Sequence, residues 1–391
     1  MIKKIKKLFV AIMSLFILGT IFLFSTGNEY VFRAAKLTYL QGNFTANIDD
    51  YKDFDTRIIK TSTTPQLWEY HENFNKKPLT NTLRNKLEEL NSSGFLIVKD
   101  GKIITEKYFD NYSDTSLTNS FSVAKTFVTM LLGKAIEDGY IKNLEQPITD
   151  FLPEYNNDPL AKTCTIGDLS SMTAGYNWNE NYYLPLNETT KSYYGRNLEN
   201  QLLDINFNTI SGEKFEYKSG DTGLLAFIIT RATQRTLSEY LSEKFWKPLG
   251  MEASALWSLD NENGLEKGFC CVSVRLRDFA KMGQLLLQNG KWKGKQLLDS
   301  AFVAKMTHPN TLNGKNKNPI YGYGIWTDYN FNPQIYSMVG HLGQRVICIP
   351  SKKIVIVRTG NKSDKRNQNR TIPGVETYIW VKESLKMTKN Q

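Results

Sequence analysis

The chain has 391 residues, of which 41% are hydrophobic and 23% are charged, and this composition excludes a disordered or low-complexity protein. Its formal net charge is +10, but the basic excess lies in two short segments, residues 3–7 and 352–370, and the remainder is balanced. A nucleic-acid-binding protein needs a basic face with base-reading or stacking residues, and the sequence shows neither. We therefore expect no nucleic-acid partner.

The first 27 residues have the composition of a targeting segment. The basic stretch Met1–Lys7 precedes Leu8–Phe24, a run of 17 residues without a charge. This run is slightly long for a signal-peptide core and slightly short for a membrane-spanning helix of about 20 residues. The positive-inside rule predicts an exported protein, periplasmic or extracytoplasmic, that contacts the membrane through this segment. The sequence leaves open whether the segment is cleaved as a signal peptide or whether residues 8–24 remain as an inner-membrane anchor.

The cysteines and histidines do not form a metal-binding pattern. The adjacent pair Cys270 and Cys271 is a poor disulfide candidate, and no Cys-x-x-Cys or mixed Cys/His spacing occurs. The three histidines lie far apart in the sequence. We therefore predict neither a metal ion nor another cofactor.

The first predicted elements are a hairpin and a buried helix. Residues 28–93 are polar and weakly periodic, and we expect an N-terminal extension there. Asp100-Gly101 separates the apolar runs Phe95–Val98 and Ile103–Tyr108, which is a strong hairpin signal. The segment Ser122–Tyr140 is apolar around most of its circumference, so it predicts a helix buried between layers.

Helices and then strands follow. Residues 141–215 are loop-rich, and the later predicted elements are helices at Thr222–Thr233, Leu237–Trp246, Arg277–Gln288 and Val375 to about Lys386, and strands at Gly268–Val274, Gln344–Ile349 and Ile354–Thr359. Strands near both ends of the region predict an α/β (α+β) fold, an antiparallel sheet flanked by helices. The sheet part comprises about 94–120 and 251–386, and a mostly α-helical insertion comprises about 121–250.

The first candidate for catalysis is the pair Ser122 and Lys125. Residues three apart share one face of a helix, and a serine hydroxyl needs an adjacent base such as a desolvated lysine. The spacing alone is weak evidence, because Ser211-Gly212-Glu213-Lys214 repeats it in a glycine-containing loop with no apolar helix after it. The apolar helix after Ser122 distinguishes the first copy.

Two further segments carry groups that suit the same site. Tyr217 lies in a short loop before an apolar helix, where a phenol near a lysine can shuttle a proton. Gly340-His341-Leu342-Gly343-Gln344 precedes a predicted strand, where glycines let a substrate approach backbone N–H groups. Taken alone, Tyr217 is by default a loop tyrosine packed on the surface, because the chain has 20 tyrosines. The segment 340–344 alone is equally compatible with a simple strand-entry turn.

In this order the three segments resemble the Ser-x-x-Lys, Tyr-x-Ser/Asn and Lys-Thr-Gly motifs of the serine β-lactamase and penicillin-binding-protein superfamily. The flanks resemble its class C branch, which also contains esterases, D-aminopeptidases and 6-aminohexanoate-dimer hydrolases. The matching segments are Phe121–Thr126, Ile166–Gly175, Tyr217–Gly220, Lys247–Met251 and Gly340–Arg345. The resemblance implies a β-lactamase/transpeptidase-like fold, with a serine hydrolase domain at about 94–386.

The resemblance also implies roles for individual residues. Ser122 corresponds to the acylated nucleophile, and Lys125 and Tyr217 to the groups that share general acid and base work. The backbone N–H groups of Ser122 and Gln344 correspond to the oxyanion hole. Ser219 stands where the family often has Asn, and is expected to bond near Lys125 or the substrate.

The third motif departs from the family. His341 and Gly343 belong to a His-Leu-Gly triplet that replaces Lys-Thr-Gly, which removes a permanent cation and a hydroxyl. Because histidine is mostly neutral at pH 7, recognition of an anionic substrate is expected to weaken. This favours an esterase or amidase over a true β-lactamase.

Together these observations predict an exported serine hydrolase that acts through an acyl-enzyme on a small-molecule or short-peptide ester or amide. The alternatives are a catalytically silent penicillin-binding or sensor protein and a cell-wall D,D-peptidase. Aromatic residues of the insertion either line an apolar cleft or are ordinary core and surface residues: Trp178, Tyr182, Tyr183, Tyr193 and Tyr194. The sequence does not set the oligomeric state.

Overall fold

The main sheet has seven strands in the order β12-β13-β14-β15-β3-β4-β2. A computed structural model describes residues 2–312, 316–317, 320–364 and 374–389. The pairings are antiparallel except for β2 with β4. The strands are β2 Glu69–Tyr70, β3 Ser92–Lys99, β4 Lys102–Tyr108, β12 Trp326–Asp328, β13 Ile335–Gly340, β14 Gln344–Ile349 and β15 Ile354–Gly360.

The central strands are buried on both faces because helices cover both. Ile354 and Ile356 of β15 pack with α3 (Asn81–Glu89) and α12 (Val375–Thr388), whereas Val355 and Val357 face the other side. There, α10 (Leu276–Leu287) crosses so closely that a Cβ on Gly283 would lie 2.7 Å from Val346 Cγ1. Such double coverage explains why β14 and β15 are almost continuously apolar rather than alternating.

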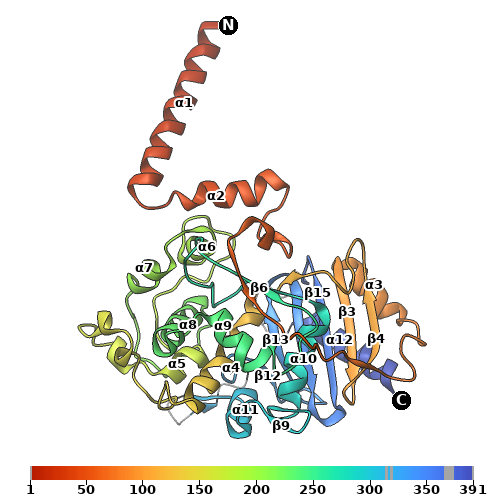
Figure 1. Cartoon of the computed structure of the whole chain (residues 1–391). Coiled ribbons are helices and arrows are strands. Elements are labelled where there is room, and N and C mark those ends of the chain that lie inside the picture. The colour runs from red at the N-terminus through yellow and green to blue at the C-terminus, as the bar shows by residue number, and fades with distance from the viewer. Residues whose placement is uncertain (1, 313–315, 318–319, 365–373, 390–391) are drawn as a thin grey trace.

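A second, four-stranded sheet in the order β1-β6-β7-β5 leads into the helical region. Its strands are β1 Thr56–Ile59, β5 Thr118–Asn119, β6 Ala255–Ser258 and β7 Val272–Val274. Between β5 and β6 lie α4 Ala124–Glu137, α5 Ile166–Ser171, α6 Glu188–Tyr194, α7 Leu198–Leu203, α8 Ser219–Thr233 and α9 Leu237–Leu241, the last continued by a π-helical turn at Ser242–Trp246. The helical region therefore lies beside the main sheet (Figure 1), and within it α4 packs against α8 and α9.

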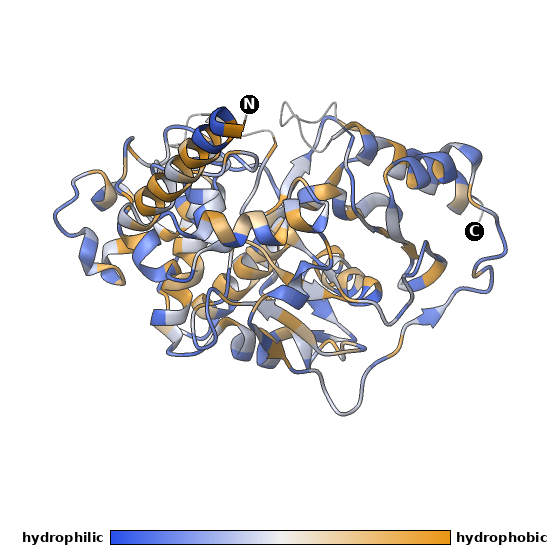
Figure 2. Cartoon of the chain, turned by 90° about the horizontal axis from the view of Figure 1, so that it is seen from above, coloured by the Kyte–Doolittle hydropathy of each residue, from blue (hydrophilic) through white to orange (hydrophobic). Residues whose placement is uncertain are grey.

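The remaining elements are short or lie at the N-terminus. They are α1 Ile2–Ser25, α2 Tyr30–Leu37, β8 Lys291–Trp292, β9 Lys295–Gln296, α11 Ser300–Thr307, β10 Thr311–Leu312 and β11 Asn316–Lys317. Helix α1 points away from the rest of the protein, and α2 lies across the helical region (Figure 1). By length and composition α1 is able to cross a membrane, and none of its residues is buried. In Figure 2 most of α1 beyond its hydrophilic start is coloured as hydrophobic.

The structure confirms the predicted antiparallel sheet flanked by helices, and it confirms the hairpin and the C-terminal strands nearly residue by residue. The predicted strand Gly268–Val274 was too long, because residues before Val272 form a turn instead. The predicted helix from Ser122 begins as a 3₁₀ turn at Phe121–Val123, and the α-helix itself starts at Ala124.

Residues 28–93 contribute to both sheets rather than only preceding them. Strand β1 pairs with β6, and β2 pairs with β4. Thr80 caps α3 by accepting a hydrogen bond from the Leu83 N–H, and Leu83 and Leu87 are fully buried under the main sheet. The polar composition of this segment reflects strands at sheet edges and a helix with only one buried face.

We expect Leu83→Ala to lower the free energy of unfolding by about 2–5 kcal/mol, because it removes a fully buried side chain and leaves a cavity. The matched change Ile58→Ala, at a side chain that is 53% exposed, is expected to stay within about 0.5 kcal/mol. Denaturant unfolding followed by tryptophan fluorescence measures both. Equal effects would show that α3 is not part of the core.

Candidate active site

Ser122 lies on a tight turn between β5 and α4. The preceding residue, Phe121, has φ +44°, a left-handed conformation that is strained for a bulky side chain. The turn is held by hydrogen bonds from Phe121 N to Asn119 Oδ1 (2.9 Å) and from Ser120 N to the Val272 carbonyl (2.8 Å). This conformation leaves Ser122 partly exposed at the N-terminal end of α4, where the helix dipole favours negative charge.

Lys125, in the first turn of α4 and one turn after Ser122, is 1% exposed. Its amine contacts three oxygen atoms: Ser122 Oγ at 2.9 Å, Ser219 Oγ at 3.0 Å and the Phe269 carbonyl at 2.8 Å. Burial lowers the pKa of Lys125 to about 8, although the nearby charges of Glu180 and Asp221 act in the opposite direction. About a tenth of this amine is therefore neutral at pH 7, and the neutral fraction rises to about half near pH 8.

A buried carboxylate, Glu180, fixes the direction of these hydrogen bonds. It accepts hydrogen bonds from Ser219 N (2.6 Å) and from Ser219 Oγ (2.7 Å). Since the Ser219 hydroxyl donates its one proton to Glu180, its oxygen must accept from Lys125. The Phe269 carbonyl can also only accept. A neutral Lys125 amine has two N–H groups for these two acceptors, so its lone pair is left to face the hydroxyl of Ser122.

The ring of Tyr217 lies next to the same amine. Lys125 Nζ is 5.2 Å from the centroid of the Tyr217 ring, and this ring stacks on Trp326 with 4.9 Å between centroids. Tyr217 stands in the loop immediately before α8, whose first residue is Ser219. The start of α8 thus brings Tyr217 and Ser219 together at Lys125.

His341 forms part of the opposite wall and is neutral. Its Nε2 atom lies 3.2 Å from Thr45 Oγ1, and its ring lies between those of Phe121 (5.4 Å) and Tyr182 (5.2 Å). Burial lowers the pKa of His341 to about 4. It therefore supplies no cation at neutral pH, as the sequence predicted.

Gly343 and Gln344 follow in a turn held from behind by Arg358. A Cβ on Gly343, which has φ +83°, would lie 2.5 Å from Arg358 Nη1. The fully buried Arg358 donates hydrogen bonds to the carbonyls of Leu342 and Gly343. The side chain of Gln344 is bound to the backbone of Gly360.

The backbone N–H of Gln344 already has an acceptor in this turn, the carbonyl of His341. Its predicted role as an oxyanion donor therefore stays a prediction, and it requires this N–H to be shared with, or turned toward, a bound substrate. A backbone N–H that is shared between two acceptors is common at helix ends.

A cavity of about 60 Å³ is lined by Ser122, Ser219, His341 and Phe269 together with Thr45 and Cys270. Three of the five aromatic residues considered from sequence also line it: Tyr182, Tyr193 and Tyr194. Trp178 is buried behind Gly220, and Tyr183 is 63% exposed. The free volume suits a small acyl group rather than a drug-sized ligand of about 300 Å³ or more.

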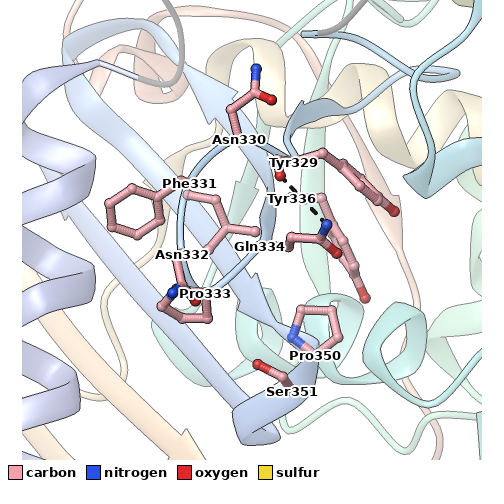
Figure 3. Close-up of a pocket in the computed structure, with 10 residues that line it drawn as sticks. Tyr329, Asn330, Phe331, Asn332, Pro333, Gln334, Tyr336, Pro350 and Ser351 are labelled. Atoms are coloured by element: carbon pink, nitrogen blue, oxygen red, sulfur yellow. Dashed lines mark hydrogen bonds between the residues drawn. The ribbon is translucent and has the colours of Figure 1, made fainter.

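A second cavity, of about 500 Å³, lies around the loop Tyr329–Tyr336 and includes Pro350 and Ser351 (Figure 3). It contains none of the residues predicted from sequence. We place the candidate active site at the smaller cavity because Ser122, which contacts the buried Lys125, lines it together with Ser219 and His341; Tyr217 lines a different cavity.

The sequence did not identify Glu180, Thr45 or the Phe269 carbonyl as parts of the site. It was also wrong about the adjacent cysteines, because Cys270 and Cys271 form a disulfide at the cavity. Neighbouring side chains point to opposite sides of an extended chain, but Cys271 has φ +76° and the chain turns there. Across the residues that the structure describes, no group of three or more His, Cys, Asp or Glu side chains suits a metal ion.

In the second Ser-x-x-Lys copy, the serine and the lysine bond to other groups rather than to each other. The buried hydroxyl of Ser211 donates to the carbonyl of Ala174 (2.6 Å). Lys214 pairs with Glu216 instead of reaching Ser211.

Comparison with known proteins supports the resemblance seen in the sequence. A family model described as Beta-lactamase matches residues 79–374, more than half of the chain. A 6-aminohexanoate-dimer hydrolase from Paenarthrobacter ureafaciens is 25% identical over 232 residues, which is 56% of this chain and 58% of that protein. The chain thus matches less than two thirds of the length of this curated relative.

Two solved structures share the fold. A putative 6-aminohexanoate-dimer hydrolase from Bacillus anthracis has a TM-score of 0.73 at 23% identity, covering 86% of this chain and 94% of its own. A class C β-lactamase has a TM-score of 0.59 at 15% identity, covering 83% and 100%. The predicted β-lactamase/transpeptidase-like fold is therefore confirmed.

The state of Lys125 predicts how the reactivity of Ser122 depends on pH. Below a pH of about 8 the amine is protonated and cannot accept the hydroxyl proton, so labelling of Ser122 by a fluorophosphonate should rise with pH, with its midpoint near that value. Mass spectrometry of the labelled protein measures the rate. Lys125→Met should abolish labelling, whereas Lys134→Met on the same helix should not. A pH-independent rate would contradict this role.

Proposed function

Because the chain belongs to the Beta-lactamase family, we propose that it is a serine hydrolase that cleaves an ester or amide bond through an acyl-enzyme. The observation that carries this proposal is the buried Lys125 amine, 2.9 Å from Ser122 Oγ and with its pKa lowered to about 8. A weak nucleophile and a matched base are thus already in contact.

In the acylation step, the Ser122 oxygen attacks the substrate carbonyl while its proton passes to the lone pair of Lys125. The resulting oxyanion is stabilised at the start of α4 by the Ser122 N–H and, on the family pattern, by the Gln344 N–H. The ammonium of Lys125 and the hydroxyl of Tyr217 then supply the proton that the leaving alcohol or amine needs. The carbonyl–leaving-group bond breaks, and the acyl group remains on Ser122.

Deacylation repeats these steps with water. Lys125, neutral again, takes a proton from the attacking water, and the same donors stabilise the second oxyanion. Collapse of that intermediate breaks the bond to Ser122 Oγ and returns the proton to it. The products are a carboxylic acid and the free enzyme.

Glu180 is a positioning residue in this scheme. It holds the Ser219 hydroxyl so that Ser219 accepts from Lys125. Without that constraint the Ser219 hydroxyl is free to donate to the amine and to compete with Ser122 for its lone pair.

The cavity supports a small, uncharged acyl group as the substrate portion bound next to Ser122. Its volume is about 60 Å³, and His341, whose pKa burial lowers to about 4, provides no cation for a carboxylate. The matched relative is named for hydrolysis of an aminohexanoate dimer. We therefore favour esters or amides of short chains over β-lactams.

We also propose that α1 anchors the protein in a membrane with the catalytic domain outside the cytoplasm. The support is its 24-residue length, its apolar composition and the fact that none of its residues is buried. The lysines at its start favour a cytoplasmic N-terminus.

The first prediction concerns the nucleophile. Ser122→Ala should abolish both the fluorophosphonate adduct and hydrolysis of a p-nitrophenyl ester without unfolding the protein, because one partly exposed hydroxyl contributes little to stability. Ser211→Ala, the matched change in the second motif, should leave turnover intact. If the Ser122 variant remains active, or if folded wild-type protein reacts with no acylating reagent, the proposed hydrolase is excluded.

A second prediction tests the positioning role of Glu180. Loss of one charge-assisted hydrogen bond, about 1.5–3 kcal/mol, should lower kcat/KM by about 10- to 100-fold in Glu180→Gln. The Glu180 charge raises the pKa of Lys125, so its removal should also move the midpoint of the pH–rate profile to lower pH. Glu213→Gln, at an exposed position, is the control. A lower rate with an unmoved midpoint would indicate only a structural role.

A further inference from the structure

The segment after α2 and the loop before α6, two helices that contact each other, carry six exposed large side chains, which we call the apolar rim. Their exposed fractions range from 49% to 84%. Three belong to the segment after α2 and three to a loop of the helical region: Tyr39, Leu40, Phe44, Tyr183, Leu184 and Leu186. Exposed apolar residues gathered in this way indicate an interaction surface.

The rim is held close to the end of α1. The ring of Phe24, in the last turn of α1, stacks on Phe32 of α2 with 5.9 Å between centroids. The opposite face of α2 is buried against the helical region through Tyr30, Ala34 and Leu37. Because these contacts leave only a short turn between α1 and the domain, a membrane that contains α1 must lie directly beside this side of the protein.

The two halves of the rim meet at α2. Tyr30 and Asn28 share a shallow cavity with Leu186 and Asn187. The loop of the helical region therefore lies next to the segment that leaves α1.

The rim also borders the mouth of the candidate active site. Thr45 and Tyr182 line the cavity and contact His341. Their chain neighbours Phe44 and Tyr183 are 84% and 63% exposed. At each of these two places, one residue lines the cavity and its chain neighbour is exposed on the rim.

We propose that the apolar rim docks on the surface of the bilayer that holds α1, so that the Ser122 cavity opens at the level of the lipid headgroups. The inference rests on the proposed anchoring by α1. The uncharged part of α1, residues 8–25, is about 27 Å long at 1.5 Å per residue, close to the thickness of a hydrocarbon core of about 30 Å, and the lysines before it lie at the cytoplasmic surface. Its end at Ser25 then lies at the interface, where tyrosine and other aromatic side chains are favoured.

This placement has a consequence for the substrate. An ester or amide group carried on an amphiphile embedded in the bilayer meets Ser122 directly, whereas a freely soluble substrate must reach the same cavity from the water layer. The rim therefore selects for the location of the substrate, while the cavity selects for its acyl group.

The docking test uses the full chain in phospholipid vesicles, with an environment-sensitive fluorophore attached at Phe44→Cys. Labelling is selective because Cys164 and Cys348 are buried and the other two cysteines form a disulfide. The matched control is Leu67→Cys, at a side chain that is 72% exposed and outside the rim. We expect a blue shift and quenching by headgroup-level spin-labelled lipids at Phe44 only. Equal signals at both sites would overturn the proposal, as would a blue shift without lipid quenching, which would indicate a second copy covering the rim.

The catalytic test compares Leu40→Ser/Phe44→Ser with Ile58→Ser/Leu67→Ser. The rim variant should lose about 10-fold in turnover of an ester carried on a vesicle-embedded amphiphile, with hydrolysis of a soluble p-nitrophenyl ester unchanged. The control variant should behave as wild type on both. If the rim variant retains full turnover of the embedded ester, the proposal is overturned.

Two measurements separate failure of this inference from failure of its premises. Co-sedimentation of the full chain with vesicles reports on α1, and the absence of co-sedimentation would overturn both the anchoring and the docking. Labelling of Ser122 by a fluorophosphonate reports on the hydrolase. Lipid quenching at Phe44 without such labelling would support the docking and contradict the proposed function.

Discussion

The candidate site depends on keeping one lysine amine out of water. A buried charge is costly unless it is compensated, and a buried amine responds by losing its proton more easily. Lys125 is in this position because α4 runs through the centre of the helical region and leaves the side chain 1% exposed. Its three oxygen neighbours satisfy the charged form with three donated hydrogen bonds and the neutral form with two donated and one accepted. Both protonation states are thus compatible with the same geometry, which a proton carrier requires.

Local patterns in the sequence were sufficient to predict the strands and helices that surround Lys125. β14 and β15 are short apolar runs on either side of a turn, and α8 is a long apolar segment after a loop, so their positions followed from periodicity and turn residues. The pairing of Ser122 with Lys125 is also local, since it needs only one helical turn. Tyr217 was assigned to the site because the order of the motifs resembles that of the family, and not because of its spacing from Ser122 or Lys125.

The missing parts of the site are contacts between distant segments that have no local signature. Glu180 reaches Ser219 across 39 residues, and Thr45 reaches His341 across 296. In both cases a polar residue in an irregular loop looks the same in the sequence whether it is solvated or buried. The disulfide of Cys270 and Cys271 was not predicted for a related reason. It accompanies a positive φ at Cys271, and cysteine is not a residue type that indicates this conformation in a sequence.

The N-terminal segment around Asp50 is connected to Ser122 through the buried side-chain amide of Asn119. This segment therefore supports the active site as well as linking α1 to the rest of the protein. The carboxylate of Asp50 accepts hydrogen bonds from Asn119 Nδ2 (3.0 Å) and the Tyr193 hydroxyl (2.6 Å). Since a carboxylate attracts the NH₂ end of the Asn119 amide, the oxygen of that amide is turned toward Phe121 N, which it binds at 2.9 Å. The strained turn before Ser122 is therefore held in part by Asp50, six residues after Phe44 of the apolar rim. The cavity wall at Thr45 and the geometry of the nucleophile consequently depend on one continuous stretch of chain.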